Sequence, residues 1–131
     1  MEKLIENEKV TLKVYPGKNI IHHKIKDFIS GDRWKELMKT GIDAYKKHDC
    51  NKWLSDDRGN SALKDEDEKW AQEYWEPQIL EAGWDYWAIL MPEKAIGQMT
   101  LERLKGRYED KGVEVKVFSD TDEALGWLEE Q

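Results

Sequence analysis

The stretch Trp53-Leu54-Ser55-Asp56-Asp57-Arg58-Gly59-Asn60-Ser61-Ala62-Leu63 begins as a short strand and continues as a polar loop. We expect the strand to cover residues 52–56 and the loop, over 57–64, to lead into a helix. A strand, a polar loop and a helix in that order are typical of α/β sheets, whose ligands bind outside the carboxyl ends of the strands. The stretch therefore predicts both a fold class and the place of a candidate site.

The residues before this stretch predict an antiparallel hairpin and one helix. Apolar residues alternate at period two over 10–15, and the turn sequence Pro16-Gly-Lys-Asn19 joins this strand to a second one over 20–28. Leu4-Ile5 predicts a short edge strand before the hairpin. The helix expected over 32–48 carries an apolar stripe at the i, i+3, i+4 and i+7 positions, so one face of it should pack on a core.

Helices and strands alternate after the loop. The helix from Asp65 should be kinked or restarted at Pro77 and should end at Gly83, because proline breaks the backbone ladder and glycine ends helices. The run Tyr86-Trp-Ala-Ile-Leu-Met91 is apolar throughout, which predicts a strand buried on both faces in a parallel part of the sheet. A helix, a strand and a final helix should follow over residues 94–108, 112–118 and 120–128.

These elements predict a single α/β domain over residues 1–131. Its N-terminal β-hairpin is followed by alternating α and β elements, which favours a mixed sheet flanked by helices. A chain of 131 residues fits one domain with an ordinary hydrophobic core.

Composition narrows the classes of partner and compartment. The net charge of −7 disfavours nucleic acid and anionic membranes, which attract basic surfaces. No apolar run is long enough for a membrane span, and the N-terminus lacks the apolar segment of a signal peptide. The single cysteine, Cys50, allows no internal disulfide and no cysteine-based zinc site. We therefore expect a cytoplasmic protein without a metal or a cofactor.

The chain resembles the SpoIIAA-like group of small α/β domains, which includes the STAS domains, and looks like an uncharacterised bacterial branch of it. The resemblance lies in Lys52-Trp-Leu-Ser-Asp-Asp57, the tryptophan-rich segment 70–83, Ala88-Ile-Leu-Met-Pro92, Val115-Lys-Val-Phe118 and Asp122-Glu-Ala-Leu-Gly-Trp-Leu128. It implies a regulatory or protein-interaction role. In STAS anti-sigma antagonists a serine of an Asp-Ser-Ser-Gly motif is phosphorylated. This chain has Asp57-Arg-Gly-Asn-Ser61-Ala there, which makes Ser61 the positional counterpart and departs from the motif.

Six polar residues around the expected strand end form the first group of candidate binding residues: Ser55, Asp56, Asp57, Arg58, Asn60 and Ser61. Neighbouring carboxylates could hold a cation or a hydroxylated ligand, and the start of the next helix could bind an anion. The alternative is local, because Asp, Asn, Gly and Ser also build tight turns and helix caps.

Aromatic residues form the second group of candidates: Trp70, Tyr74, Trp75 and Trp87. Trp70 and Tyr74 share a helix face, whereas Trp75 lies about 100° away from Tyr74 around the helix. One stripe cannot bury all three. They could line a small apolar pocket, form a contact with a protein partner or a second copy of the chain, or belong to the core.

The remaining reactive side chains favour structural roles. His22 and His23 are adjacent on a strand and should point to opposite faces, so one metal ion cannot easily take both. Cys50 should be a semi-buried thiol, and the acidic run Asp65-Glu-Asp-Glu68 a solvated helix start. No acid, base and nucleophile converge, so no catalytic residue is predicted.

Three functions follow, in order of preference. The first is a non-enzymatic regulatory or protein-interaction domain of the STAS-like type. The second is a carrier that resembles the Sec14 type, with a pocket for a small apolar ligand or lipid. The third is an enzyme that uses Asp56 and Asp57 with a divalent metal.

Overall fold

The computed structural model describes residues 1–131 and contains one six-stranded mixed sheet. The strands are β1 (Glu2–Glu6), β2 (Val10–Tyr15), β3 (Ile20–Ile25), β4 (Lys52–Asp56), β5 (Tyr86–Leu90) and β6 (Glu114–Phe118), and they lie in the sheet in chain order. β1, β2 and β3 pair antiparallel, and β3 through β6 pair parallel. The predicted α/β class with an N-terminal hairpin is confirmed, and so is the edge strand at Leu4-Ile5.

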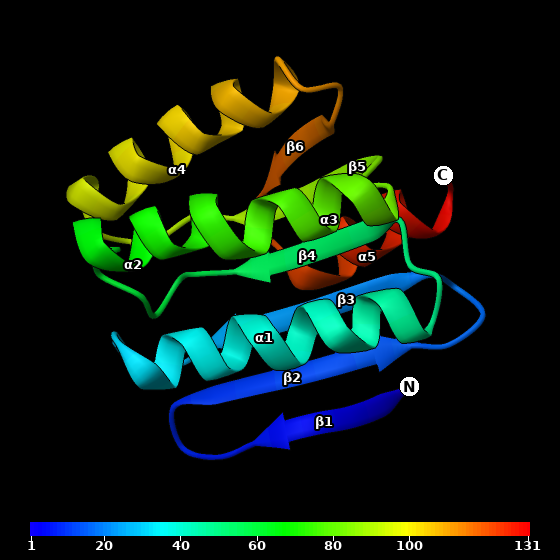
Figure 1. Cartoon of the computed structure of the whole chain (residues 1–131), viewed down its shortest axis with the longest axis horizontal. Coiled ribbons are helices and arrows are strands. Elements are labelled where there is room, and N and C mark those ends of the chain that lie inside the picture. Colours follow the sequence, from blue (N-terminus) through cyan, green and yellow to red (C-terminus); the bar gives the residue numbers. More distant parts are fainter.

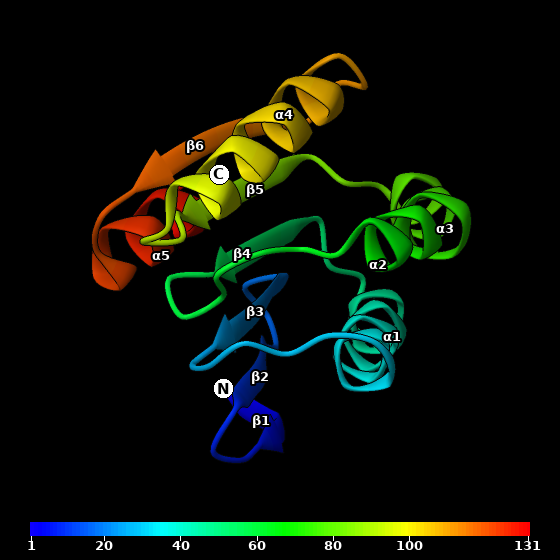
Figure 2. The ribbon, with the colours of Figure 1, turned by 90° about the vertical axis from the view of Figure 1, so that its left-hand side faces the viewer.

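The helices cover the sheet unequally. They are α1 (Asp32–Lys47), the continuous run α2 (Asp65–Trp70), η1 (Ala71–Trp75) and α3 (Glu76–Ala82), then α4 (Ala95–Glu109) and α5 (Thr121–Glu129). Figure 1 shows α1, α2, α3 and α4 in front of the sheet, with α5 behind β4. Seen along the sheet, α1 and α3 lie on one side and α5 on the other (Figure 2).

The side chains of β4 point alternately to the two faces of the sheet, which explains why helices cover both faces. Trp53 belongs to the large core of 24 buried residues under α1, η1 and α4, whereas Leu54 belongs to a smaller core under α5. Successive side chains of a strand point to opposite faces, so Ser55 follows Trp53 and Asp56 follows Leu54. β5 does the same with Trp87 and Ala88. The apolar run 86–91 is buried on both faces because both cores rest on it.

Pro77 marks a change of helix type. The five residues of η1 before α3 form a π-helical turn, and Pro77 lies at the first turn of α3. Proline lacks an N–H group and crowds the carbonyl group one turn before it, and a widened turn relieves both problems. The predicted interruption at Pro77 is therefore a π-turn in an unbroken helical run. Gly83 ends that run with a φ of 99°, as predicted.

His22 is a buried titratable group on the α5 side of the sheet. Its Nδ1 lies 3.2 Å from the hydroxyl group of Tyr15, and its Nε2 has no hydrogen-bond partner. Burial, with a smaller contribution from neighbouring His23, lowers the pKa of His22 from the ordinary value of 6.5 to about 3. The folded protein thus holds this imidazole neutral at pH values where the unfolded chain protonates it.

Stability should therefore fall as the pH drops below 6.5. Each pH unit between the unfolded and folded pKa values of His22 costs about 1.4 kcal/mol, so His22 alone should contribute a loss of about 2–3 kcal/mol to the wild type between pH 6.5 and 4.5. Urea unfolding at these two pH values measures the loss. His22→Leu should lose clearly less, whereas His48→Gln, at a half-buried histidine, should lose as much as the wild type. Equal losses in all three proteins would contradict the assignment.

Candidate functional site

A cavity of about 80 Å³ lies on the helix-covered face at the carboxyl ends of β4 and β5. α1, η1 and α4 contribute its other walls. Its aromatic lining consists of Trp34, Trp53, Trp75, Trp84, Trp87 and Tyr108, all buried. Its polar lining consists of His23, Ser55, Asp57, Asn60, Glu68, Gln72 and Thr100. The cavity occupies the place where open α/β sheets bind ligands.

The cavity runs from a half-buried rim to a buried floor. Ala62 and Leu63 of the loop, Gln72 of η1 and Thr100 of α4 are half-buried lining residues, whereas Ser55 and the tryptophans are buried. A molecule that enters between the loop and α4 would therefore meet aromatic walls and buried polar groups.

One wall holds a buried relay of three side chains. Trp53 Nε1 donates to His23 Nδ1 at 2.9 Å, and His23 Nε2 lies 2.9 Å from Asp57 Oδ1. An indole N–H can only donate, so Nδ1 must accept and the proton of the neutral ring lies on Nε2. His23 therefore donates to the Asp57 carboxylate, and both of its ring nitrogens are engaged.

A second indole fixes the serine beside this relay. Trp87 Nε1 donates to Ser55 Oγ at 2.8 Å, and both side chains are buried. Parallel register brings the two groups together: His23 pairs with Ser55 across β3 and β4, while Ser55 pairs with Ile89 across β4 and β5. The Ser55 hydroxyl retains its own proton for another acceptor.

Two buried polar atoms of the lining have no partner within the protein. They are Trp75 Nε1, a donor, and Asn60 Oδ1, an acceptor. The residues Trp75 and Asn60 are only 5% and 7% exposed, respectively. Leaving such a group unsatisfied costs about 1–3 kcal/mol. The π-turn ends at Trp75 and directs its indole inward, and π-turns are frequent at functional sites.

The loop that carries Asp57 and Asn60 is held by backbone contacts. Asp57 N donates to Leu90 O at 3.0 Å, and Asn60 N donates to Asp57 O at 2.9 Å. A Cβ atom on Gly59 would lie 2.4 Å from the carbonyl oxygen of Lys26. Only glycine lets the loop approach the end of β3 so closely.

Two arginines of α4 join it to the neighbouring helices beside the cavity. Arg103 Nη1 and Nη2 donate to the Glu68 carboxylate at 2.7 and 2.6 Å. Arg107 Nε and Nη2 donate to the Glu76 carboxylate at 2.8 and 2.9 Å. The Arg103 hydrogen bonds hold the pKa of Glu68 below its ordinary range. Burial raises the pKa of Glu76, but hydrogen bonds from Arg107 and Tyr108 outweigh it and the net pKa is lowered. Glu68 thus belongs to an ion pair, not to the solvated helix start expected for the acidic run.

The structure brings five of the ten predicted site residues together around the cavity: Ser55, Asp57, Asn60, Trp75 and Trp87. Asp56 and Arg58 lie apart from it. Arg58 Nε and Nη2 donate to Asp56 at 3.0 and 2.8 Å on the α5 side, and Arg58 also contacts Thr121 at 3.3 Å. Burial raises the pKa of Asp56, yet these Arg58 contacts prevail and lower it. Asp56 and Asp57 therefore do not form the neighbouring acid pair of the metal-enzyme hypothesis.

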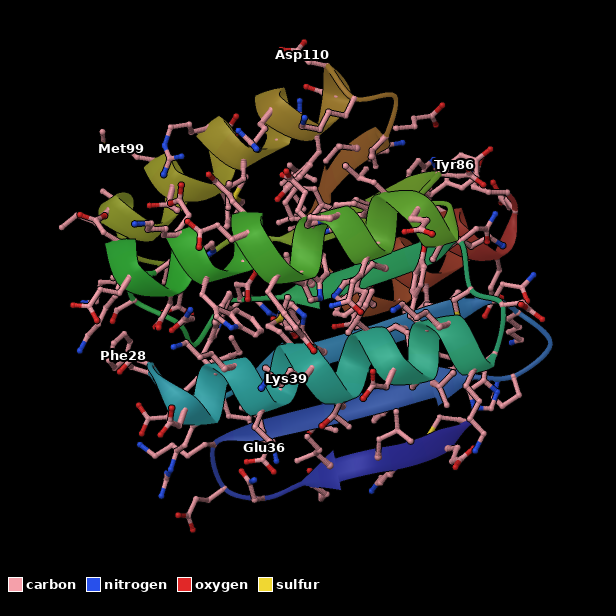
Figure 3. All side chains as sticks on the ribbon, viewed as in Figure 1. Phe28, Glu36, Lys39, Tyr86, Met99 and Asp110 are labelled. Carbon is pink, nitrogen blue, oxygen red and sulfur yellow. The ribbon has the colours of Figure 1, made fainter.

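The other three predicted residues lie outside the cavity lining, and Trp70 among them is half-buried against the core. Ser61 is exposed in the loop. Trp70 and Tyr74 stack with ring centroids 5.0 Å apart, and Tyr74 is 43% exposed. The Lys39 ammonium of α1 lies 5.5 Å from the Tyr74 ring centroid and 6.0 Å from that of Trp70, and Figure 3 places Lys39 on the outer side of α1.

Sequence reasoning assigned a structural role to His23 and no role to Trp53, although both line the cavity. The period-two rule placed His23 on the opposite face from His22, which the structure bears out. The same rule applied to β4 separates Asp57 from Asp56. No local sequence pattern predicts that β3 and β4 pair in parallel or in which register they do so.

Comparison with protein-family models, with curated proteins and with solved structures finds no match for this chain. None of the helices has the length and apolar character needed to cross a membrane. No cluster of three or more histidine, cysteine or acidic side chains is arranged to hold a metal ion.

Proposed function

We propose that this chain is a non-enzymatic domain that binds a small molecule in the cavity between β4, β5, η1 and α4. The observation that carries the proposal is the pair of buried, unpartnered atoms Trp75 Nε1 and Asn60 Oδ1 in the lining of one cavity. A ligand with both an acceptor and a donor would satisfy them together. The aromatic walls would supply the apolar contact typical of small-molecule sites.

The engagement of His23 supports binding rather than catalysis. A general base needs a free ring nitrogen within reach of the proton that it takes. Nδ1 of His23 accepts from Trp53 and Nε2 donates to Asp57. Ser55 Oγ, which accepts from Trp87, is bonded to neither nitrogen. The relay thus holds the cavity wall in place and is not arranged as a serine, histidine and aspartate triad.

The size of the cavity sets the size of the ligand. Apolar cavities of about 150 Å³ hold benzene, so a cavity of about 80 Å³ accommodates a smaller group. A larger ligand would place only its tip inside and extend past the rim at Ala62 and Thr100. This favours a small polar molecule, or the head of a longer one, over a fully enclosed lipid chain.

The indole proton of Trp75 tests the proposal by NMR. Acetamide has a carbonyl acceptor and an N–H donor on four heavy atoms. Such a small ligand is limited to about 1.5 kcal/mol of binding energy per heavy atom, about 6 kcal/mol in all, so its dissociation constant should be no lower than tens of micromolar. Titration should shift the Trp75 indole signal, identified from Trp75→Phe, in a saturable way. The indole signal of Trp70, a half-buried residue outside the lining, should stay in place. Absence of any saturable shift at Trp75 would contradict the proposal.

A second candidate is a STAS-like regulatory domain that docks a protein partner. Two observations favour it: Ser61 is exposed for modification, and the Trp70–Tyr74 stack with Lys39 forms an exposed aromatic and basic surface. A partner on that surface would shift the Trp70 indole signal and leave Trp75 unchanged. The same spectrum therefore distinguishes the two functions.

A further inference from the structure

The fully charged residues of the cavity lining are all acidic. Its residues include the acids Asp57 and Glu68 and no lysine or arginine. Glu68 is neutralised by Arg103, which leaves Asp57 as the one acid of the lining without a cationic side chain within ion-pair distance. The neighbouring guanidinium, that of Arg58, is turned to the other face of the sheet, where it binds Asp56.

Asp57 is therefore a buried carboxylate without a counter-charge. It is 8% exposed, and its one ion-pair contact is with His23, at 2.9 Å. Trp53 donates to the other nitrogen of that ring, so the ring carries one proton and no charge in this arrangement. A buried carboxylate that lacks a cation is costly, because burial removes its hydration without an opposing charge. A cation in the cavity would supply the opposing charge.

The aromatic walls suit the same kind of ligand. The rings of Trp53 and Trp75 are inclined by 84°, with centroids 5.1 Å apart, and those of Trp75 and Trp84 by 86°, with centroids 5.5 Å apart. At these distances the rings pack edge to face, so each ring covers part of the face of its neighbour. An indole face that stays open to the cavity would attract a cation.

We infer that the ligand is a small organic ammonium ion that also carries an oxygen acceptor. The inference rests on the proposed function and adds the chemical class of its ligand. The ammonium group would lie against Asp57 and the indole faces and donate to Asn60 Oδ1. The oxygen atom would accept from Trp75 Nε1. Each unpartnered or uncompensated group of the cavity then has a role.

Three probes of similar size and different charge test this class. Ethanolamine is protonated at pH 7, like other alkylamines; ethylene glycol is its neutral counterpart and glycolate an anionic one. In titrations at constant ionic strength, followed by the Trp75 indole signal and by tryptophan fluorescence, ethanolammonium should bind about tenfold more tightly than ethylene glycol. Glycolate should not bind in a saturable way. The inference is overturned if ethylene glycol binds as tightly as ethanolammonium, or if glycolate binds best.

Two matched variants locate the charge preference. Asp57→Asn keeps an oxygen acceptor for His23 and should remove most of the preference for ethanolammonium. Glu73→Gln removes the same charge from an exposed residue of η1. This variant should retain the preference for ethanolammonium. If Asp57→Asn does not fold, the wild-type comparison of the three probes still decides. Saturable acetamide binding without a preference for the cation would overturn this inference alone, whereas no saturable binding of any probe would overturn the proposed function as well.

Discussion

Replacement of Trp53 by alanine should lower the free energy of unfolding by about 3–5 kcal/mol, the range found for large aromatic side chains removed from cores. Trp53 is 1% exposed, and its ring lies 5.1 Å from that of Trp75 and 5.9 Å from that of Tyr45. Its far edge fits against Gly41, where a Cβ atom would lie 2.6 Å from the ring. α1 cannot close the space that alanine would leave without shifting its backbone.

The change would also remove a polar contact. Without the indole, His23 Nδ1 loses the donor that fixes the ring toward Asp57. Since domains are stable by about 5–15 kcal/mol, the variant should be close to unfolding at room temperature. Urea unfolding followed by circular dichroism measures this.

Trp70→Ala is the matched control. The Trp70 side chain is half-buried and stacks on the exposed Tyr74 at the surface. Its removal should cost less than half as much as removal of Trp53. If the two alanine variants are equally destabilised, Trp53 does not have the central packing role assigned to it.

The elements of the fold were largely predictable because their signals are local. Period-two alternation in β2, the apolar run of β5 and the break at Pro77 each depend on neighbouring residues. The order of the strands and the registers between them depend on contacts across the chain. Nothing in the sequence alone sets His23 of β3 beside Ser55 of β4.

The site was predictable in part for the same reason. The polar loop after β4 marked its place, and the strand pleat determines that Ser55 and Asp57 face the cavity while Asp56 faces Arg58. The sequence did not distinguish Trp75, which lines the cavity, from Trp70, which does not. The π-turn over Ala71–Trp75 changes the helical phase between them, and regular helical spacing does not predict it.

The second large effect concerns the mouth of the cavity. Ala62 is a half-buried lining residue of the loop, whereas its neighbour Ser61 is exposed and outside the lining. Ala62→Trp would place an indole across the opening, and Ser61→Trp would place the same side chain in solvent. The two variants differ by one position and have the same added bulk, so they separate a blocked cavity from a general effect on the loop.

The binding of acetamide and ethanolammonium to the wild type and these two variants is the most direct test of a ligand site in this cavity. Each protein is first checked for its fold by circular dichroism, and dissociation constants are then measured by NMR titration. Ser61→Trp should bind as the wild type does, and Ala62→Trp should bind at least about tenfold more weakly, a loss of about 1.4 kcal/mol or more. A folded Ala62→Trp variant that binds both probes as tightly as the wild type would contradict the account.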